Sequence, residues 1–400
     1  MDGIAAARPL TIRAARHAPI EPRDRPRDRG FAIDIASAAD DAEIRRLLRH
    51  ASFGGDVQIS LEREPDSTLA ASVEGDEHCA LIARHVRSGA IAGVASRSVR
   101  SVFVNGVPSR VAYLGQLRID PRFSRHRGLL AAGFDRIRNL QFSSPSAPQL
   151  HLASVVSENV AARRLLSRRA PGWPTFEAMD TLVSLAIPTR SRNPARRSAR
   201  VTCERGSIAD MDALVSCLDR NGARFQFYPA WSRADLTGPR TRGLSLDDFV
   251  VARRDGALVG CVASWDQRAF KQVRVRGYSP RVSRWRPIVN AFSRITNVPH
   301  LPRVGDALQF AYLSHLAIDD REDEGVIVDL VDAAVAMAYQ RGLDYVVLGL
   351  SAAHPFLAAV RHAFSHRAYE SILYVAFWPD AAAIATSLDR RPSHPELAIL

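Results

Sequence analysis

The chain contains 400 residues, of which 46% are hydrophobic and 24% are charged, as in an ordinary globular protein. Its 54 lysine and arginine residues outnumber its 42 aspartate and glutamate residues, so the formal net charge is +12. No apolar run approaches the ~18 residues of a membrane-spanning helix, and the N-terminal stretch lacks the apolar core of a signal peptide. We therefore expect a cytoplasmic protein of two or three domains that does not enter a membrane.

The positive charge suggests a nucleic-acid partner, but its composition argues against one. Lys271 is the single lysine of the chain, so nearly all of the positive charge comes from arginine. Abundant arginine together with abundant alanine is what a GC-rich coding sequence would produce. An acidic small-molecule substrate would also benefit from positive potential. We therefore expect no nucleic-acid partner.

The four cysteines show no metal-binding pattern. Cys79, Cys203, Cys217 and Cys261 form no Cys-x-x-Cys pair and have no histidine neighbours at metal-ligand spacing. Their distribution is typical of small buried side chains in a reducing compartment. We therefore expect no metal site.

The first part of the chain predicts an arm followed by a domain. Residues 1–29 combine arginines with prolines and show no apolar periodicity, so we expect a disordered arm. An N-terminal domain is predicted over residues 30–186, and its residues 52–76 are polar and glycine-bearing. Its predicted elements are a strand at Phe31–Ile35, a helix capped by Asp40 or Asp41, strands over 78–86 and 90–99, a tight hairpin turn at Asn105-Gly106, and a strand over 176–185 that closes the sheet.

The most informative stretch runs from Ala112 to Leu140 and predicts a strand, a basic turn and a helix. Asp120-Pro121 ends the extended run, because the residue before proline avoids helical geometry. After the turn, apolar residues recur at helical spacing. Gly128 at the start of this helix would let unpaired backbone N–H groups approach an anion, and the arginines before it would add positive charge. We therefore predict a pyrophosphate-binding turn here.

This turn resembles the acyl-CoA pyrophosphate loop of the GNAT acyltransferase superfamily, whose Arg/Gln-x-x-Gly-x-Gly/Ala pattern matches Arg125-x-x-Gly128. Leu130 departs from the last position of that pattern. The strand-like run Leu150–Val156 and the helix that starts at Asn159 are similar to the segment after the family's fifth strand. The resemblance implies acetyl-CoA or another acyl-CoA as co-substrate, with no metal. The residues that it places on the acyl-CoA are Leu117, Arg118, Ile119, Arg125, His126, Arg127, Gly128, Leu129, Leu130, Asn159 and Arg163.

A second copy of the strand pattern occurs later in the chain. Ala112-Tyr113-Leu114-x-x-Leu117-x-Ile119-Asp120 returns as Ala311-Tyr312-Leu313-x-x-Leu316-x-Ile318-Asp319, and each copy precedes a predicted helix and a buried strand. This repetition indicates duplication of one domain. Together with the resemblance, it predicts an α/β fold of two GNAT-like domains in tandem, each a mostly antiparallel mixed sheet flanked by helices.

The second copy differs from the first in charge. We predict a linker over residues 187–199, a C-terminal domain over 200–379 and a tail over 380–400. The turn at residues 319–325 carries five carboxylates, which would repel a pyrophosphate, so we expect this domain to be degenerate and structural. Residues 266–307 place aromatic residues between arginines. We interpret them as packing one domain on the other, with nucleic-acid stacking as the alternative.

The resemblance also implies that an amine attacks the acyl-CoA thioester directly. Many family members carry a glutamate base and a tyrosine acid at positions that here hold Gly115 and Leu166, so both usual groups are missing. The remaining catalytic candidates are Gln116 and Tyr113, which could orient the acceptor, and Glu158, which could act through water. The structural alternatives are a packed strand aromatic for Tyr113 and a helix-cap carboxylate for Glu158.

We therefore expect an acyl-CoA-dependent N-acyltransferase, most simply an N-acetyltransferase, that acts on a primary amine of a small molecule as a monomer or homodimer. An aminoacyltransferase that uses aminoacyl-tRNA is one alternative, and RNA binding with a steep salt dependence would favour it. A non-catalytic acyl-CoA-binding module is another, because the usual base and acid are absent. A scaffold or toxin-related interaction protein is the last alternative.

Overall fold

A computed structural model of the chain describes residues 30–52, 54–124, 126, 128–142, 147–190, 201–292, 300–320 and 323–400. The predicted arm at residues 1–29, Arg125 and Arg127 of the basic turn, and residues 191–199 of the predicted linker lie outside the described residues. Among the helices that are described, none has the length and apolar character needed to span a membrane.

The first half of the chain follows the predicted order of elements and adds two within residues 52–76, where none was predicted. The elements of this half are β1 (Phe31–Ile35), α1 (Asp41–His50), β2 (Val57–Glu62), α2 (Ser67–Glu74), β3 (Glu77–His85), β4 (Ile91–Val104), β5 (Val107–Ile119), α3 (Gly128–Phe142), β6 (His151–Val156), α4 (Val160–Leu166) and β7 (Thr175–Pro188), of which β2 and α2 are the additions. Asn105 and Gly106 adopt φ angles of 53° and 83° in the β4–β5 turn, which confirms the predicted tight hairpin. The predicted domain boundary at residue 186 falls inside β7.

The second half repeats much of this order. Its elements are β8 (Thr202–Arg205), α5 (Met211–Gly222), α6 (Arg233–Thr237), β9 (Phe249–Arg254), β10 (Ala257–Trp265), β11 (Gln272–Tyr278), α7 (Pro280–Phe292), β12 (Phe310–Ile318), α8 (Glu324–Gln340), β13 (Tyr345–Ser351), α9 (Leu357–Ala363), β14 (Arg367–Phe377) and α10 (Ala382–Thr386). The two copies of the repeated pattern are β5 and β12, and each is followed by a helix and then a strand.

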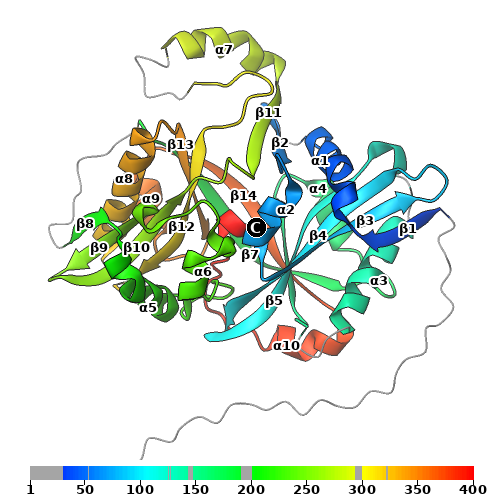
Figure 1. Ribbon diagram of the computed structural model, residues 1–400, viewed down its shortest axis with the longest axis horizontal. Coiled ribbons are helices and arrows are strands. Elements are labelled where there is room, and N and C mark those ends of the chain that lie inside the picture. The colour runs from blue at the N-terminus through cyan, green and yellow to red at the C-terminus, as the bar shows by residue number, and fades with distance from the viewer. Residues whose placement is uncertain are drawn as a thin grey trace, which may run out of the picture.

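The strands of both halves form one mixed sheet of twelve strands, in the order β1-β3-β4-β5-β6-β14-β7-β13-β12-β10-β9-β8. Neighbouring strands are antiparallel except for two pairs, β5 with β6 and β12 with β13. The two halves lie side by side along this sheet (Figure 1). The predicted mixed, mostly antiparallel α/β fold is confirmed.

The centre of the sheet differs from the prediction, because the two halves exchange their last strands. Strand β14 of the second half lies between β6 and β7 and is antiparallel to both. Strand β7 of the first half in turn pairs with β13 of the second half. The prediction that residues 176–185 close the first sheet is therefore wrong, since each sheet is completed by a strand from the other half. A local sequence pattern can indicate a strand, but it does not show which other strands will pair with it.

Helices cover both faces of the sheet in each half. In the first half, Ile44 of α1 packs against Ile82, whereas Phe134 of α3 packs against Leu81. Adjacent residues of a strand point to opposite faces, so α1 and α3 cover opposite faces. In the second half, the nearly all-apolar helix α8 lies in the largest buried cluster, and α5 belongs to the cluster on the other face.

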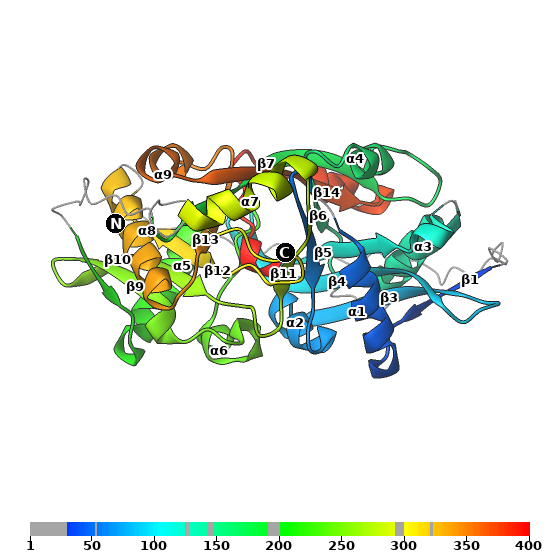
Figure 2. The same cartoon turned by 90° about the horizontal axis from the view of Figure 1, so that it is seen from above.

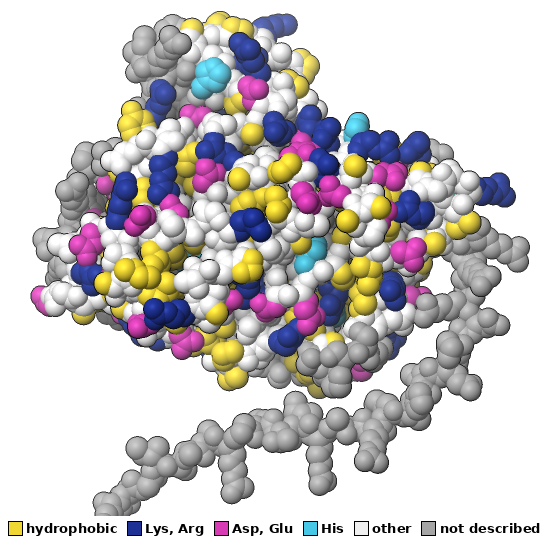
Figure 3. Space-filling view, in the orientation of Figure 1, with side chains coloured by type: hydrophobic (Ala, Val, Ile, Leu, Met, Phe, Trp, Pro, Cys, Tyr) yellow, Lys and Arg dark blue, Asp and Glu magenta, His cyan; other side chains and the backbone are white. Residues whose placement is uncertain are grey.

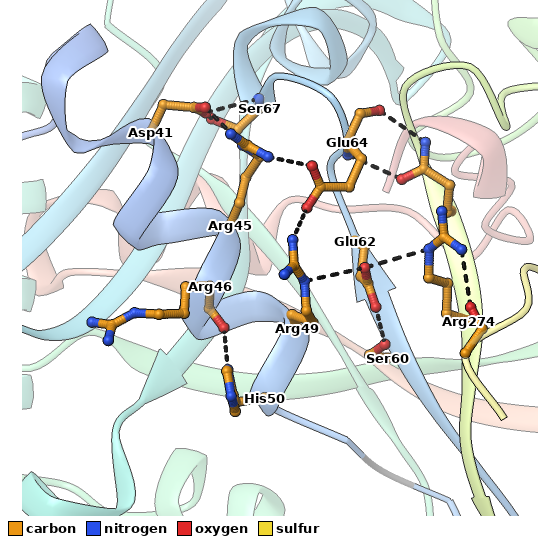
Figure 4. Close-up of polar contacts among 12 residues, drawn as sticks. Asp41, Arg45, Arg46, Arg49, His50, Ser60, Glu62, Glu64, Ser67 and Arg274 are labelled. Atoms are coloured by element: carbon orange, nitrogen blue, oxygen red, sulfur yellow. Dashed lines mark hydrogen bonds and ion pairs between the residues drawn. The ribbon is translucent and has the colours of Figure 1, made fainter.

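A separate ribbon of two strands, β2 and β11, joins the halves (Figures 1 and 4). Beside it, the buried carboxylate of Glu62 contacts Arg49 of α1 at 3.8 Å and Arg274 of β11 at 3.5 Å. The prediction that residues 266–307 pack one half on the other is thus confirmed for β11. Trp285 of α7 is instead 55% exposed, on a helix that stands out from the body.

The C-terminal segment is not a loose tail, because it ends between the two halves (Figures 1 and 2). Ala398 and Ile399 are fully buried in the second half's core cluster. Leu397 lies against Gly349 of β13, where a Cβ atom added to the glycine would come within 2.6 Å of the leucine Cβ. Close approach of the segment to the sheet therefore requires a glycine at this position.

We expect Gly349→Ala to destabilise the protein by about 1–3 kcal/mol, because overpacking a tight contact forces the backbone to shift. Urea unfolding followed by circular dichroism measures the change. Gly133→Ala in α3 is the matched control, since an added Cβ atom there meets nothing within 4 Å. The control should be neutral or stabilising by up to about 1 kcal/mol. Equal stability of both variants would contradict the packing described for residues 396–399.

Candidate active site

Strand β5 carries a bulge at its centre. Gln116 has a φ angle of 53°, and the register between β4 and β5 shifts between Val94 and Ser96. A non-glycine residue at positive φ is uncommon in a strand and marks a site that the surrounding structure holds in place. The bulge therefore turns the Gln116 side chain away from the regular alternation of the strand.

The same strand separates from β6 on its other side. The two strands pair only at Ala112 with His151 and at Tyr113 with Leu152. From Leu114 to Ile119, β5 has no partner strand on that side among the described residues. Backbone groups along this edge are thus available to a ligand placed between β5 and β6. Of the residues predicted to contact acyl-CoA, Leu117, Arg118 and Ile119 lie along this edge.

The basic turn leads from β5 into α3, as the sequence predicts. Helix α3 begins at Gly128, and the side chain of His126 rests against Phe31, with ring centroids 5.0 Å apart. Leu129 is buried and Leu130 half-buried, so both anchor the helix rather than offer side chains to a ligand. The first backbone N–H groups of a helix remain available to an anion.

The residues predicted after β6 have local structural roles. Asn159 caps α4, because its Oδ1 accepts a hydrogen bond from the Ala162 N–H at 3.0 Å. Arg163 donates to the Ser157 carbonyl oxygen at 3.0 Å. Glu158 is exposed in the turn before α4. The structure therefore groups Asn159 and Arg163 at the start of α4 but gives Glu158 no position in the buried polar cluster described next.

A row of polar side chains crosses the face of the sheet beneath α2. His78, Ser98 and Tyr113 are direct partners on β3, β4 and β5, so they share this face. The Tyr113 hydroxyl lies 2.7 Å from Ser154 Oγ on β6, at the point where β5 and β6 separate. The Arg100 guanidinium lies 5.5 Å from the centre of the Tyr113 ring. Tyr113 thus stands at the closed end of the gap between the strands.

Glu74, the last residue of α2, is the centre of this polar cluster. Its buried carboxylate accepts a hydrogen bond from Arg63 at 2.7 Å and from the Gln116 amide nitrogen at 3.1 Å. His78 Nδ1 lies 3.5 Å from the same carboxylate and 2.9 Å from Ser98 Oγ. Sequence reasoning missed Glu74, because it is one acidic residue in the unassigned stretch 52–76 and its partner Gln116 is 42 residues away.

The backbone is crowded at Gly115, where the resemblance would place a glutamate. A Cβ atom on Gly115 would lie 3.0 Å from the Tyr113 ring and 3.2 Å from Ser96 Oγ, so a side chain there would press on both residues. Leu166, at the position where the resemblance would place a tyrosine, is buried. A carboxylate nevertheless reaches this part of the site, since Glu74 arrives from the neighbouring helix and contacts the bulged residue Gln116.

Burial shifts the pKa values of several groups in the junction between the halves. Burial raises the pKa of Tyr113, so its hydroxyl stays protonated at neutral pH. Arg100, with its pKa lowered to about 10 by burial, stays charged. Burial, followed by the nearby Arg63 charge, lowers the pKa of Lys271 to about 7. Burial also raises the pKa of Glu396 to about 7.

The equivalent place in the second half is occupied by the chain itself. His315 in β12 has a φ angle of 54°, as Gln116 does in β5, and the register with β10 shifts beside it. Its backbone N–H donates to the Glu396 carboxylate at 2.8 Å. With Leu397 against β13, residues 396 and 397 contact both strands of this second pair.

The helix after β12 is closed to an anion by its own residues. Asp323 caps α8, and its Oδ1 accepts a hydrogen bond from the Gly325 N–H at 3.1 Å. Asp319 is paired with Arg220 at 2.6 Å, and Asp323 with Arg254 at 2.8 Å. Arg220 and Arg254 therefore neutralise carboxylates of this acidic turn, whereas the turn before α3 is itself basic. Within the described residues, no group of histidine, cysteine and acidic side chains could hold a metal ion.

We expect Lys271→Met to remove a pH dependence of stability. Between pH 7 and the ordinary lysine pKa of 10.5, the unfolded wild-type chain binds one more proton than the folded chain. The free energy of unfolding of the wild type should therefore rise relative to that of the variant, by as much as roughly 4 kcal/mol from pH 7 to pH 10. Urea unfolding at several pH values measures this difference. Because Lys271 is the single lysine, no other lysine contributes, and parallel pH profiles would contradict the prediction.

Comparisons with known proteins bear on this arrangement. No family model matches the chain, and a search of curated proteins also found no match. Solved structures do resemble it. A GCN5-related glucosamine N-acetyltransferase region of a fungal multi-domain β-N-acetylglucosaminidase aligns with a TM-score of 0.58 at 13% identity, over 87% of this chain and 38% of that one.

Two further structures cover most of both chains. A GCN5-related N-acetyltransferase from Sphaerobacter thermophilus aligns with a TM-score of 0.50 at 13% identity, over 86% of this chain and 95% of that one. N-myristoyltransferase from Saccharomyces cerevisiae, solved with bound myristoyl-CoA, aligns with a TM-score of 0.56 at 11% identity, over 89% and 81% of the two chains. At such identities the likeness concerns the fold alone. The expected fold is thus confirmed: the chain has the GNAT fold.

Proposed function

We propose that the protein is an acyl-CoA-dependent N-acyltransferase, with acetyl-CoA as the simplest co-substrate and a primary amine of a small molecule as acceptor. The observation that carries this proposal is the bulged strand β5. It separates from β6 after Tyr113 and leads through a basic turn into α3, which begins at Gly128. The bound myristoyl-CoA of the yeast neighbour supports an acyl-CoA as the ligand of this fold.

In this proposal, the acyl-CoA lies in the gap between β5 and β6. Backbone N–H groups at the start of α3, with Arg125 and Arg127, bind the pyrophosphate. Backbone N–H groups along the edge of β5 that faces β6 polarise the thioester carbonyl. The acceptor nitrogen attacks the carbonyl carbon, the C–S bond breaks, and the leaving thiolate takes a proton. Tyr113, whose raised pKa keeps it protonated, is placed at the closed end of the gap to donate that proton.

Gln116 has the role of orienting the acceptor in this proposal. Its side chain is half-buried and is fixed by the Glu74 carboxylate, and the bulge directs it toward the face beneath α2. The second half provides no comparable site. Asp323 caps α8 and residues 396 and 397 contact β12 and β13, so we propose a structural role for that half.

Two observations rank the alternatives below this function. Basic side chains lie among acidic ones over much of the face in Figure 3, which favours a small acceptor over a tRNA. The cluster of His78, Glu74 and Tyr113 beside the gap is richer in proton-transfer groups than a purely binding module needs. RNA binding with a steep salt dependence would favour the aminoacyl-tRNA alternative. Acyl-CoA binding without turnover would favour the binding module.

We expect acetyl-CoA to bind the wild-type protein with micromolar affinity in isothermal titration calorimetry. Arg125→Ala should weaken binding by about 10–100-fold, because a charge-assisted hydrogen bond to phosphate is lost. Gly128→Glu should abolish binding by adding a side chain and a negative charge at the helix start.

Arg205→Ala on the distant edge strand β8 makes the same charge change as Arg125→Ala and is the control, which should bind like the wild type. A wild-type protein that binds neither acetyl-CoA nor a longer acyl-CoA would refute the proposed function.

A further inference from the structure

Resting on the proposed function, we propose that His78 is the catalytic residue that accepts the proton from the acceptor amine, and that Glu74 is the positioning residue that holds and stabilises it. Neither residue occupies the position of the strand glutamate or the helix tyrosine that many members of the resembled family carry. Their assignment comes from the contacts that bring α2, β3 and the bulge of β5 together.

The backbone places Glu74 against the sheet. Gly75 follows it, and a Cβ atom on this glycine would lie 2.4 Å from the Val99 carbonyl oxygen of β4. Asp76 N–H then donates to the same oxygen at 2.8 Å. These contacts hold the end of α2 close against β4. Glu74, the last residue of α2, therefore lies over the polar face of β3, β4 and β5. This close approach explains how a carboxylate from the helix reaches the bulge.

His78 and Gln116 share one oxygen of Glu74. Oε2 is 3.5 Å from His78 Nδ1 and 3.1 Å from Gln116 Nε2. The His78 imidazole therefore lies close to Gln116, the residue at the bulge. Beyond this bulge, β5 runs beside the gap between β5 and β6. The His78 side chain is 17% exposed, whereas that of Glu74 is 4% exposed. The imidazole is thus the more accessible of the two to an acceptor.

The protonation states suit these roles. Burial lowers the pKa of His78 below the usual 6.5, so its imidazole is neutral at pH 7 and can accept a proton. Burial alone would raise the pKa of Glu74, but the nearby positive charges, that of Arg63 first, outweigh it and hold the carboxylate ionised. An ionised carboxylate whose oxygens already accept hydrogen bonds is a weak base. It can instead stabilise the imidazolium that forms during the reaction.

The charged groups around His78 come from several elements. Glu74 on α2 raises its pKa, whereas Arg63 after β2 and Arg100 on β4 lower it. Lys271, from the second half, faces Glu74, and Tyr113 faces Arg100. Glu74 is therefore the anionic group that directly favours protonated His78. Loss of its charge should make His78 a weaker base.

The proposed step balances as follows. The neutral amine nitrogen forms a bond to the thioester carbonyl carbon, which leaves a positive charge on the nitrogen. His78 removes one proton from that nitrogen, the C–S bond breaks, and the CoA thiolate is protonated by Tyr113 or water. The products are an amide and free CoA. His78 then returns its proton to solvent, and Tyr113, where it was the donor, regains one from solvent. General bases of this kind contribute about 10²–10⁴-fold to the rate.

The test compares two probe acceptors, tyramine and hydroxylamine, with acetyl-CoA as donor. In the tyramine adduct, the positively charged nitrogen is only weakly acidic and needs a base. In the hydroxylamine adduct, this nitrogen is more acidic and loses its proton to water. We expect His78→Gln to lower kcat with tyramine about 100-fold and with hydroxylamine less than 5-fold. The affinity for acetyl-CoA should stay unchanged in calorimetry. The acidic limb of the pH profile of kcat/KM, which reports His78, should disappear.

The Glu74 variants test the positioning role. Glu74→Gln keeps the shape but removes the charge, so we expect a lower kcat with tyramine and an acidic limb shifted to lower pH. If its buried partner Arg63 then prevents folding, the double variant Arg63→Gln/Glu74→Gln removes both charges and takes its place. His85→Gln is the matched control, because His85 Nδ1 also lies 2.9 Å from a serine hydroxyl, that of Ser88, but at the half-buried far end of β3.

The outcomes separate this inference from the proposed function. Equal losses with both probes in His78→Gln, or a preserved acidic limb, would overturn the role of His78 while leaving the transferase proposal intact. An unchanged pH profile in the Glu74 variants would overturn the positioning role. Failure of the wild-type protein to transfer acetyl groups to either probe would overturn the proposed function, and this inference with it.

Discussion

The exchange of β7 and β14 is the constraint on which the rest of the structure depends. Strand β14 pairs along most of its length with β6 on one side and β7 on the other, so neither half has a complete sheet of its own. Its residues Leu373 and Val375 are buried, and full burial of such a side chain stabilises a protein by about 1.5–3 kcal/mol. Separating the halves would expose these strands. The exchange therefore fixes the position of each half relative to the other.

That fixed arrangement creates the buried junction in which the candidate site lies. Lys271 of the second half donates to the Ala398 carbonyl oxygen at 2.8 Å, and Arg100 of the first half donates to that of Ile399 at 2.9 Å. The C-terminal segment thus connects cations from both halves. Glu74, Gln116 and Tyr113 face this junction from the first half. The polar face of the first half is consequently shaped by residues more than a hundred positions away in the sequence.

Both halves contain the same kind of bulge in the repeated strand, but its surroundings differ between them. Gln116 and His315 hold the same place in the repeated pattern, and both have a positive φ angle beside a shift of register. In the first half, the bulge adjoins a strand edge that pairs with no other strand among the described residues, and α3 begins without acidic residues. In the second half, the backbone N–H of the bulge is satisfied by Glu396, and the helix start is capped by Asp323. The two halves therefore share the geometry of the bulge. They differ in the charge of the turn that follows it and in the contact of the C-terminal segment with the second bulge.

Much of the fold could be predicted from local sequence patterns. The hairpin at Asn105-Gly106, the helix start at Gly128 and the repeated strand each depend on residues close together in the chain. The strand exchange could not be predicted, because apolar alternation in β14 does not specify its neighbours. Glu74 and the C-terminal segment were missed for the same reason, since their partners are distant in sequence. The candidates Gln116 and Tyr113 meet in one polar cluster, whereas Glu158 lies in an exposed turn.

The central claim is that one half holds an acyl-CoA and the other holds its own C-terminal segment. Native mass spectrometry of the intact chain with saturating acetyl-CoA, or with a longer acyl-CoA, measures the stoichiometry directly. One bound molecule per chain is the predicted result. Two bound molecules would contradict the account, because the second strand gap would then be open. No bound molecule at any acyl-CoA concentration would contradict the acyl-CoA site itself.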